Sequence, residues 1–220
     1  MNLGIVTTVW GDYSRYLPDW VASLTAQSTP PAVVTICDAG ADDLSPAREA
    51  LAATVLDWQI VTTAYEGMGH ARNTAVAATS TDWVMHLDAD DTLLPHAVAD
   101  AAALADRSDV VSLGALRDGQ ELVFPHVSRQ MILRGALGAF SCSPYRRRLW
   151  EQRPYRTVND WVDSALWAGF AHLGARFTGT RRAGFVYRQH PGSHSHTISR
   201  RDKQLAAAQL RRLCRRWEPC

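Results

Sequence analysis

The sequence predicts an α/β protein in which helices cover both faces of a mainly parallel sheet. Short apolar segments alternate with segments of helical periodicity through the first 113 residues, and the links between them are short. Pro18, Pro46 and Pro95 each stand near the start of a helical segment, where the missing N–H costs no helical hydrogen bond. With 220 residues, 46% of them hydrophobic, the chain can bury one good core, which favours a single domain.

The expected elements follow one another in a regular order. Five apolar segments are expected to form strands, at residues 3–9, 32–38, 58–63, 83–87 and 109–113. Helices are expected between them, near residues 18–27, 46–55, 69–79 and 95–104. After residue 113, Asp118-Gly119 between two apolar segments predicts a hairpin that adds antiparallel strands. Helices near 147–152 and 161–173 and strands around 176–177 and 185–188 complete the expected order.

Three carboxylates follow the expected strand at 83–87. Asp88, Asp90 and Asp91 stand at its carboxyl end, which is where open α/β sheets bind their ligands. Burial of three acids beside an apolar strand is costly unless cations balance them, and hard divalent cations are commonly held by carboxylates together with substrate phosphates. The pattern therefore predicts a metal–diphosphate site. The alternative is a solvated turn that caps the helix starting near Pro95.

Composition argues against several other classes of function. The net charge of +1 gives no general reason to expect nucleic acid as a partner. No apolar run is long enough to cross a bilayer and the amino terminus lacks the basic region of a secretory signal, so a cytoplasmic location is expected. The four cysteines show no zinc spacing, and free thiols are expected.

Four blocks of the sequence together resemble the family 2-type glycosyltransferases of the GT-A fold. The blocks are LGIVTTVWGDYSRYLPDWVASLTAQS at 3–28, VVTICDAGADD at 33–43, GMGHARNTAVAATSTDWVMHLDADDTLLP at 67–95, and the stretch 162–195, which contains VDSALWAGFAHLGARF and YRQHPGSHS. They occur in the order expected for that family, and the third carries its Ala-Arg-Asn and Asp-x-Asp signatures. The resemblance implies a Rossmann-like, three-layer GT-A fold with a mixed, mainly parallel central sheet.

The resemblance also implies a donor site. Asp88 and Asp90 resemble the Asp-x-Asp pair, with Asp88 toward the ribose or the metal shell and Asp90 as a direct ligand of Mn²⁺ or Mg²⁺. Asp91 is expected either to orient the metal ligands without binding the metal itself, or to cap a helix. Asp38 is expected to contact the nucleotide base or ribose, and the alternative is that it forms an Asx turn. The full set of donor-binding candidates is Thr7, Thr8, Val9, Asp38, Gly69, Arg72, Asp88 and Ala89.

The catalytic base is expected on the acceptor side. Alignment back from Gly174 places Val162-Asp163 where the family commonly has Glu-Asp, so Asp163 is the first candidate and Asp160 the second. A carboxylate here would deprotonate the attacking hydroxyl in an inverting transfer. The alternative role for both acids is to stabilise the start of a helix. Trp161 is a candidate for stacking on the acceptor sugar, and the alternative is that it packs in the core.

Histidines near the carboxyl end form a further candidate group. His190 resembles a residue that some members of the family use as a metal ligand or phosphate contact, and His194 and His196 follow it closely. The alternative for all three is an exposed loop.

The chain is expected to divide at residue 198. Residues 1–198 would form a single glycosyltransferase domain, with a nucleotide-sugar-binding half at 1–113 and an acceptor-side half at 114–198. Residues 199–220 would form a basic amphipathic helix whose apolar stripe is Ala206, Leu210, Leu213 and Trp217. That helix could contact an anionic membrane, as a peripheral protein does, or dock on the core of its own chain. Nothing in it indicates specific nucleic-acid recognition.

The functional prediction is a metal-dependent inverting glycosyltransferase. It would move a sugar from a nucleotide-diphosphate donor, by default a UDP-sugar, to the hydroxyl of an acceptor that is a glycan, a lipid-linked molecule or a protein. Three alternatives stay open: a retaining transferase, a sugar nucleotidyltransferase, and a catalytically silent module that binds a nucleotide or a sugar. The sequence does not contain the Gly-rich Arg loop that a nucleotidyltransferase would show directly after its first strand.

Overall fold

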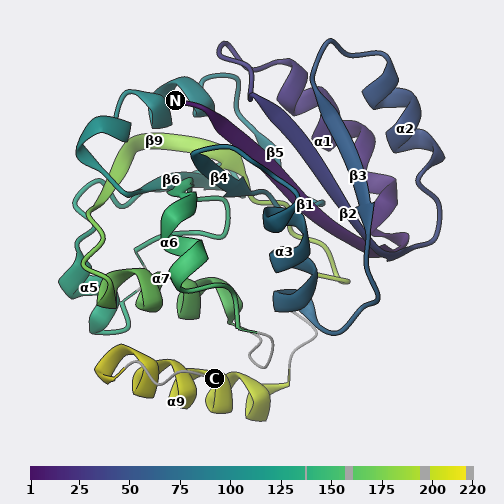
Figure 1. Ribbon diagram of the computed structural model, residues 1–220. Helices are drawn as coiled ribbons and strands as arrows, with labels where there is room; N and C mark the ends of the chain where they lie inside the picture. Colours follow the sequence, from purple (N-terminus) through teal and green to yellow (C-terminus); the bar gives the residue numbers. More distant parts are fainter. Residues whose placement is uncertain (137, 157–160, 194–198, 217–220) are drawn as a thin grey trace.

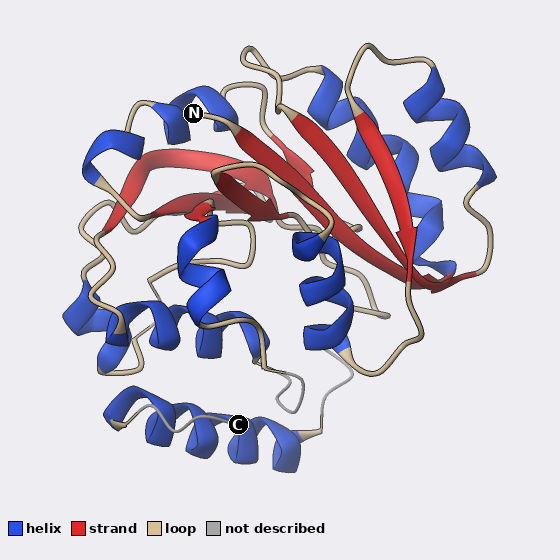
Figure 2. Cartoon of the chain, in the orientation of Figure 1, coloured by secondary structure: helices blue, strands red, loops and turns tan. Residues whose placement is uncertain are grey.

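A mixed β-sheet with helices on both faces forms the body of the protein (Figures 1 and 2). The computed structural model describes residues 1–136, 138–156, 161–193 and 199–216. Within them the strand order is β3-β2-β1-β4-β8-β6-β9-β5, and β7 pairs with β6 outside this path. The strands are β1 (Leu3–Gly11), β2 (Val33–Ala41), β3 (Trp58–Thr62), β4 (Trp83–His86), β5 (Thr92–Leu93), β6 (Val110–Arg117), β7 (Gln120–Leu122), β8 (Tyr145–Arg146) and β9 (Phe177–Val186).

The amino-terminal half of the sheet is entirely parallel. Strand β1 pairs with β2 on one side and with β4 on the other, and β3 pairs with β2. The helices that connect these strands are α1 (Leu17–Thr25), α2 (Ser45–Ala52) and α3 (Met68–Ala77). Pro18 and Pro46 lie in the first turns of α1 and α2, as predicted. This half brings the carboxyl ends of β1, β2 and β4 to one edge of the sheet.

The second half of the sheet is mixed. Strands β6 and β9 are parallel, whereas β8 is antiparallel to β4 and β6, and β5 is antiparallel to β9. The predicted hairpin joins β6 to β7, and both turn residues have positive φ, 51° at Asp118 and 75° at Gly119. The remaining helices are η1 (Asp12–Tyr16), α4 (Ala97–Ala102), η2 (Ala105–Arg107), α5 (Arg129–Leu133), α6 (Arg147–Gln152), α7 (Val162–His172) and α9 (Arg200–Arg215).

One expected division of the chain is wrong. Residues 176–177 and 185–188 do not form two strands, because β9 runs without a break from Phe177 to Val186. The polar and glycine-rich stretch between them, TGTRRAG, looks like a turn in the sequence. It stays extended because β6 pairs with it along most of its length, with register irregularities on both sides of Gly114. Helix α5 and the short strands β5 and β8 were also not anticipated.

Alternation along the strands produces two separate core clusters, one on each face. Leu3 and Ile5 of β1 face the cluster that contains the buried residues of α1, α2 and α4. Val6 of β1 and Val84 of β4 face the cluster that includes residues of α3, α5, α6 and α7. The predicted three-layer arrangement is therefore confirmed. Helix α9 lies outside the second helical layer, against α5 and α7 (Figure 1).

Candidate functional site

The acids Asp88, Asp90 and Asp91 lie where the parallel half of the sheet ends. Strand β4 is wholly buried and ends at His86, and its register with β1 brings the Thr8 hydroxyl within 3.4 Å of the His86 Nε2. Asp88 follows, beyond the buried Leu87. The acids therefore follow an apolar strand directly, at the carboxyl edge of the parallel strands.

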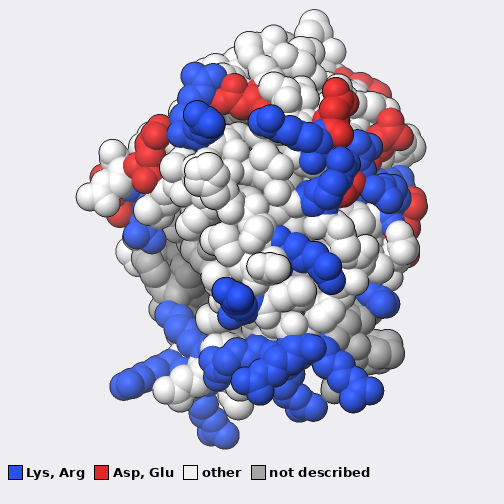
Figure 3. Space-filling view, turned by 90° about the vertical axis from the view of Figure 1, so that its left-hand side faces the viewer, with Lys and Arg blue, Asp and Glu red and all other residues white. Residues whose placement is uncertain are grey.

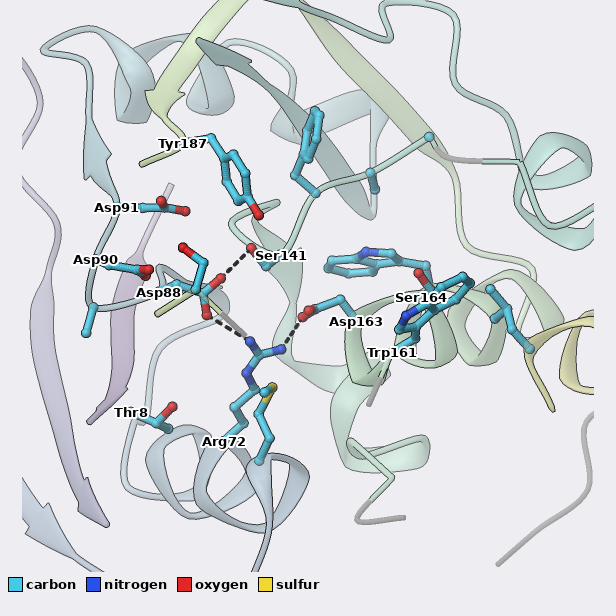
Figure 4. A pocket seen from close by; sticks show the side chains of 18 of the residues that line it. Thr8, Arg72, Asp88, Asp90, Asp91, Ser141, Trp161, Asp163, Ser164 and Tyr187 are labelled. Atoms are coloured by element: carbon cyan, nitrogen blue, oxygen red, sulfur yellow. Dashed lines mark hydrogen bonds and ion pairs between the residues drawn. The ribbon is translucent and has the colours of Figure 1, made fainter. Parts of the chain in front are cut away.

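Arg72 joins two carboxylates that are far apart in the sequence. One guanidinium nitrogen donates to Asp88 Oδ1 at 2.8 Å, and another donates to Asp163 (Figure 4). Ser141 donates to the other oxygen of Asp88 at 2.9 Å. The Arg72 side chain is 3% exposed, whereas those of Asp88 and Asp163 are 32% and 24% exposed. A buried cation thus bridges two partly buried anions in the wall of the cavity.

The two carboxylates respond differently to this shared cation. Burial is the largest effect and raises the pKa of both, but at Asp88 the combined influence of Arg72, His86 and Ser141 outweighs it and lowers the pKa below its ordinary value. At Asp163 burial prevails, and its pKa stays above the ordinary value even though Arg72 opposes the shift. An acid with a raised pKa at the edge of a cavity has the character of a group that accepts a proton.

The first turns of α3 place Arg72. Gly67 precedes the helix with a φ of 102°, a conformation that favours glycine, so the chain can turn sharply from the loop into α3. Asn73 then ties the helix to α6 and the segment after it, because its side-chain amide donates to the Tyr155 carbonyl and its oxygen accepts from Tyr155 N and Trp150 Nε1. The Ala-Arg-Asn signature therefore connects both halves of the site.

Asp90 lies with a histidine from the other end of the chain. The His190 Nε2 is 2.9 Å from Asp90 Oδ2, and these side chains are 13% and 14% exposed. Burial and the negative charge of Asp88 raise the pKa of Asp90, and the hydrogen bond from His190 opposes that rise. Tyr13 and Tyr16 pack against the His190 ring, with centroids 5.7 and 5.2 Å away.

Asp91 supports the end of β9 and does not cap a helix. Its Oδ1 accepts the Arg188 backbone N–H at 2.9 Å, and its buried Oδ2 has no hydrogen-bond partner among the described residues. The expected cap is absent because α4 begins at Ala97, after His96, and no side chain caps it. Burial and the negative charges of Asp88 and Asp90 hold the pKa of Asp91 well above its ordinary value.

A cavity of about 600 Å³ opens over these acids. Asp88, Asp90 and Asp91 line one side of it, and Asp163 lies across from them on the first turn of α7 (Figure 4). The far end is largely apolar. The described side chains there are Ile132, Trp161, Trp167 and Leu210.

The other predicted donor residues lie at different depths. Thr8 and Ala89 line the cavity, whereas Thr7 and Val9 are buried and do not. Gly69 is buried in the first turn of α3. Asp38 stands near the end of β2, where its Oδ1 accepts the backbone N–H groups of Gly40 and Ala41 in an Asx turn, the alternative weighed above. Asp160, His194, His196 and Trp217 lie outside the described residues.

Several cavity residues were missed by the sequence analysis. Trp10 lies near the carboxyl end of β1 and Tyr13 follows that strand in η1, so their place at the end of a strand could have indicated them. Ser141 gave no local signal, because it reaches Asp88 from a segment more than 50 residues away along the chain, and Tyr187 stands in the block YRQHPGSHS, of which only the histidines were proposed.

The sequence of this chain matches the glycosyl transferase family 2 over residues 5–167. The chain belongs to that family. This family assignment confirms the resemblance seen in the four sequence blocks. No curated protein sequence matches the chain significantly.

The fold is shared with many solved structures, of which two serve as examples. S. aureus TarS 1-349 in complex with UDP-GlcNAc has a TM-score of 0.75 and 20% identity, over 90% of this chain and 62% of that one. The mannosyltransferase PcManGT from Pyrobaculum calidifontis, in complex with GDP-Man and Mn²⁺, has a TM-score of 0.70 and 17% identity, over 96% of this chain and 69% of that one. The family 2 chain therefore spans about three fifths of TarS 1-349, and the likeness confirms the α/β fold.

Proposed function

We propose that this chain transfers a sugar from a nucleotide-diphosphate donor to the hydroxyl of an acceptor. The observation that carries the proposal is the set of acids in one cavity: Asp88 and Asp90 follow β4, and Asp163 of α7 is joined to Asp88 through Arg72. The bound molecules named for the two structural neighbours, UDP-GlcNAc in TarS and GDP-Man with Mn²⁺ in PcManGT, support a nucleotide-sugar donor.

Asp90 and His190 are the residues best suited to hold a divalent cation. They form a carboxylate–imidazole pair at the cavity edge, and Mg²⁺-type ions need only one or two protein carboxylates when substrate phosphates complete their shell. Asp88 is less available, because both of its oxygens already accept hydrogen bonds. Within the described ranges no group of three or more His, Cys, Asp or Glu side chains could hold a metal, so the donor's phosphates would have to supply further ligands. Bound there, Mn²⁺ or Mg²⁺ would neutralise charge on the departing diphosphate.

Asp163 is the proposed base of an inverting transfer. The acceptor oxygen would bond to the anomeric carbon while the bond from that carbon to the phosphate oxygen breaks, and its electron pair would leave with the diphosphate. The acceptor proton would pass to Asp163, whose pKa burial raises. Arg72 would orient this carboxylate, because it holds Asp163 and Asp88 at the same time.

Calorimetric titration with UDP-sugars and GDP-sugars, with and without Mn²⁺, tests the donor site. Metal-dependent binding that Asp90→Asn abolishes and the exposed-site control Asp57→Asn preserves is the expected result. Absence of binding to any nucleotide sugar, with or without metal, would contradict the proposed donor site.

Turnover separates a transferase from a silent binding module. Asp163→Asn should bind donor normally but lose about 10²- to 10⁴-fold in kcat, which is the usual contribution of a general base. Product analysis should show inversion at the anomeric carbon. Donor binding with no turnover in the unmodified protein, over a broad panel of acceptors, would favour the silent module instead.

A further inference from the structure

Helix α9 (Arg200–Arg215) carries an unbalanced positive charge on its outer face. All basic residues between 199 and 216 are exposed, and Asp202, in the first turn, is the single acid among them. The basic residues are Arg200, Arg201, Lys203, Arg211, Arg212, Arg215 and Arg216. In Figure 3 they form a continuous band along the bottom of the molecule, whereas the acidic side chains visible in that view lie higher.

The apolar face of the same helix is already occupied. Ala206, Leu210, Leu213 and Cys214 are buried against α5 and α7. The Cys214 thiol donates to the Ile132 carbonyl at 3.4 Å, and the Leu213 carbonyl accepts a hydrogen bond of 2.8 Å from His172 Nε2. The helix is therefore fixed on the protein, and only its charged face can meet a partner.

The helix that carries this charge also borders the cavity with its inner face. Leu210 reaches from the inner side of α9 into the cavity wall, together with Trp161 and Ile132. One helix thus contributes to the acceptor side of the site and presents a row of arginines to the outside. Whatever the arginines bind is therefore separated from the cavity wall only by α9 itself.

We propose that the outer face of α9 docks this protein on an anionic lipid bilayer. At 1.5 Å per residue its 16 residues span about 24 Å, a length suited to a flat charged surface. Leu205, which is 53% exposed, and the exposed Ala208 lie among the arginines, where they can enter the interfacial region. Because the apolar face is packed on the core, the attraction is mainly electrostatic and must weaken with salt.

Single-stranded nucleic acid fits this surface less well. Proteins that bind it combine positive charge with exposed aromatic rings on which bases stack. In the described part of α9 the exposed side chains include no aromatic residue. If the proposed transferase function is correct, docking would present the cavity to an acceptor hydroxyl on an amphiphile in the bilayer.

Vesicle co-sedimentation tests the docking directly. The probes are phosphatidylcholine vesicles with and without phosphatidylglycerol, at low and at physiological salt. The variant Arg201→Gln/Arg211→Gln/Arg215→Gln removes three charges from the outer face of α9. Its matched control, Arg48→Gln/Arg107→Gln/Arg181→Gln, removes three exposed arginines elsewhere, and both must retain the wild-type melting temperature and circular dichroism.

The wild type and the control should sediment with the anionic vesicles and should not sediment with the neutral ones. Each basic side chain near an anionic surface contributes about a factor of five, so the α9 variant should bind about a hundredfold more weakly. Equal weakening in both variants would show attraction by net charge alone and would overturn the proposal. Absence of vesicle binding, with α9-dependent binding of RNA or of an anionic polysaccharide, would overturn it as well.

The docking and the proposed function can fail separately. Calorimetry with a nucleotide sugar and Mn²⁺ should give the same affinity for the α9 variant as for the wild type. Conversely, Asp90→Asn should lose donor binding and still sediment with anionic vesicles. Vesicle binding that persists when no donor binds would leave the docking intact and refute the transferase alone.

Discussion

Replacement of Arg72 by Met should destabilise the protein strongly near neutral pH. The substitution keeps much of the side-chain volume but leaves Asp88 and Asp163 without the cation that both contact. Removal of one partner from a buried ion pair commonly costs about 3–5 kcal/mol. Since the two carboxylates keep 32% and 24% exposure, we expect the lower end, about 3 kcal/mol. For a chain of this size that corresponds to a fall in Tm of about 6–12 °C.

The loss should also depend on pH in a defined direction. Arg72 lowers the pKa of Asp88, so their interaction contributes stability above the ordinary carboxyl pKa and loses it as the pH falls through the lowered value. In the variant both buried carboxylates should take up protons at higher pH than before. The difference in Tm between wild type and variant should therefore be larger at pH 7 than at pH 4.5.

Differential scanning calorimetry at these two pH values measures both effects. Arg72→Lys serves as the matched variant: it retains one charge, but an ammonium group cannot span both carboxylates in the fork geometry of a guanidinium, so its loss should be intermediate. A second check is the double variant Arg72→Met/Asp163→Asn, whose loss should be smaller than the sum of the single losses. A Tm for Arg72→Met within about 2 °C of the wild type at pH 7 would refute the reasoning, because exposed ion pairs contribute only about 0–1 kcal/mol.

Three further outcomes are expected from other parts of the fold. Burial and Arg72 lower the pKa of His86 to about 3, so the folded protein loses stability relative to the unfolded chain as the pH falls from 6.5 toward 3. In urea titrations His86→Gln should remove this part of the pH dependence, which amounts to at most about 5 kcal/mol. Gly179→Ala would press a Cβ onto the Phe124 carbonyl and should cost at least about 1–3 kcal/mol in the same assay. Asp109→Asn should lower Tm at pH 7, since the buried Asp109 carboxylate accepts two 3.0 Å bonds from Arg176, and the loss should shrink in acid as Asp109 itself is protonated.

The parts of the fold that were predictable are those encoded in short stretches of sequence. Strands β1 to β4 and helices α1 to α3 follow from periodicity, from proline in the first turn and from short links. The hairpin at Asp118-Gly119 follows from two residues that tolerate positive φ. Strand β9 could not be predicted correctly, because its central residues are polar or glycine and become a strand only through their pairing with β6.

The candidate site divides in the same way. The acids Asp88, Asp90 and Asp91 share one turn after one strand, so their proximity is a property of adjacent residues. Arg72 contacts Asp163, which is 91 residues away in the sequence, and His190 contacts Asp90, which is 100 residues away. The roles predicted for these residues stay predictions until donor binding and turnover are measured.

The sequence by itself determined the family, the α/β class and the edge of the sheet that carries the acids, because local periodicity and contiguous motifs encode all three. Only the tertiary structure decided that a single buried guanidinium holds Asp88 and Asp163 together. It also decided that α9 turns its apolar face to the core and its arginines outward. These arrangements depend on packing between distant segments, and no short stretch of the chain carries that information.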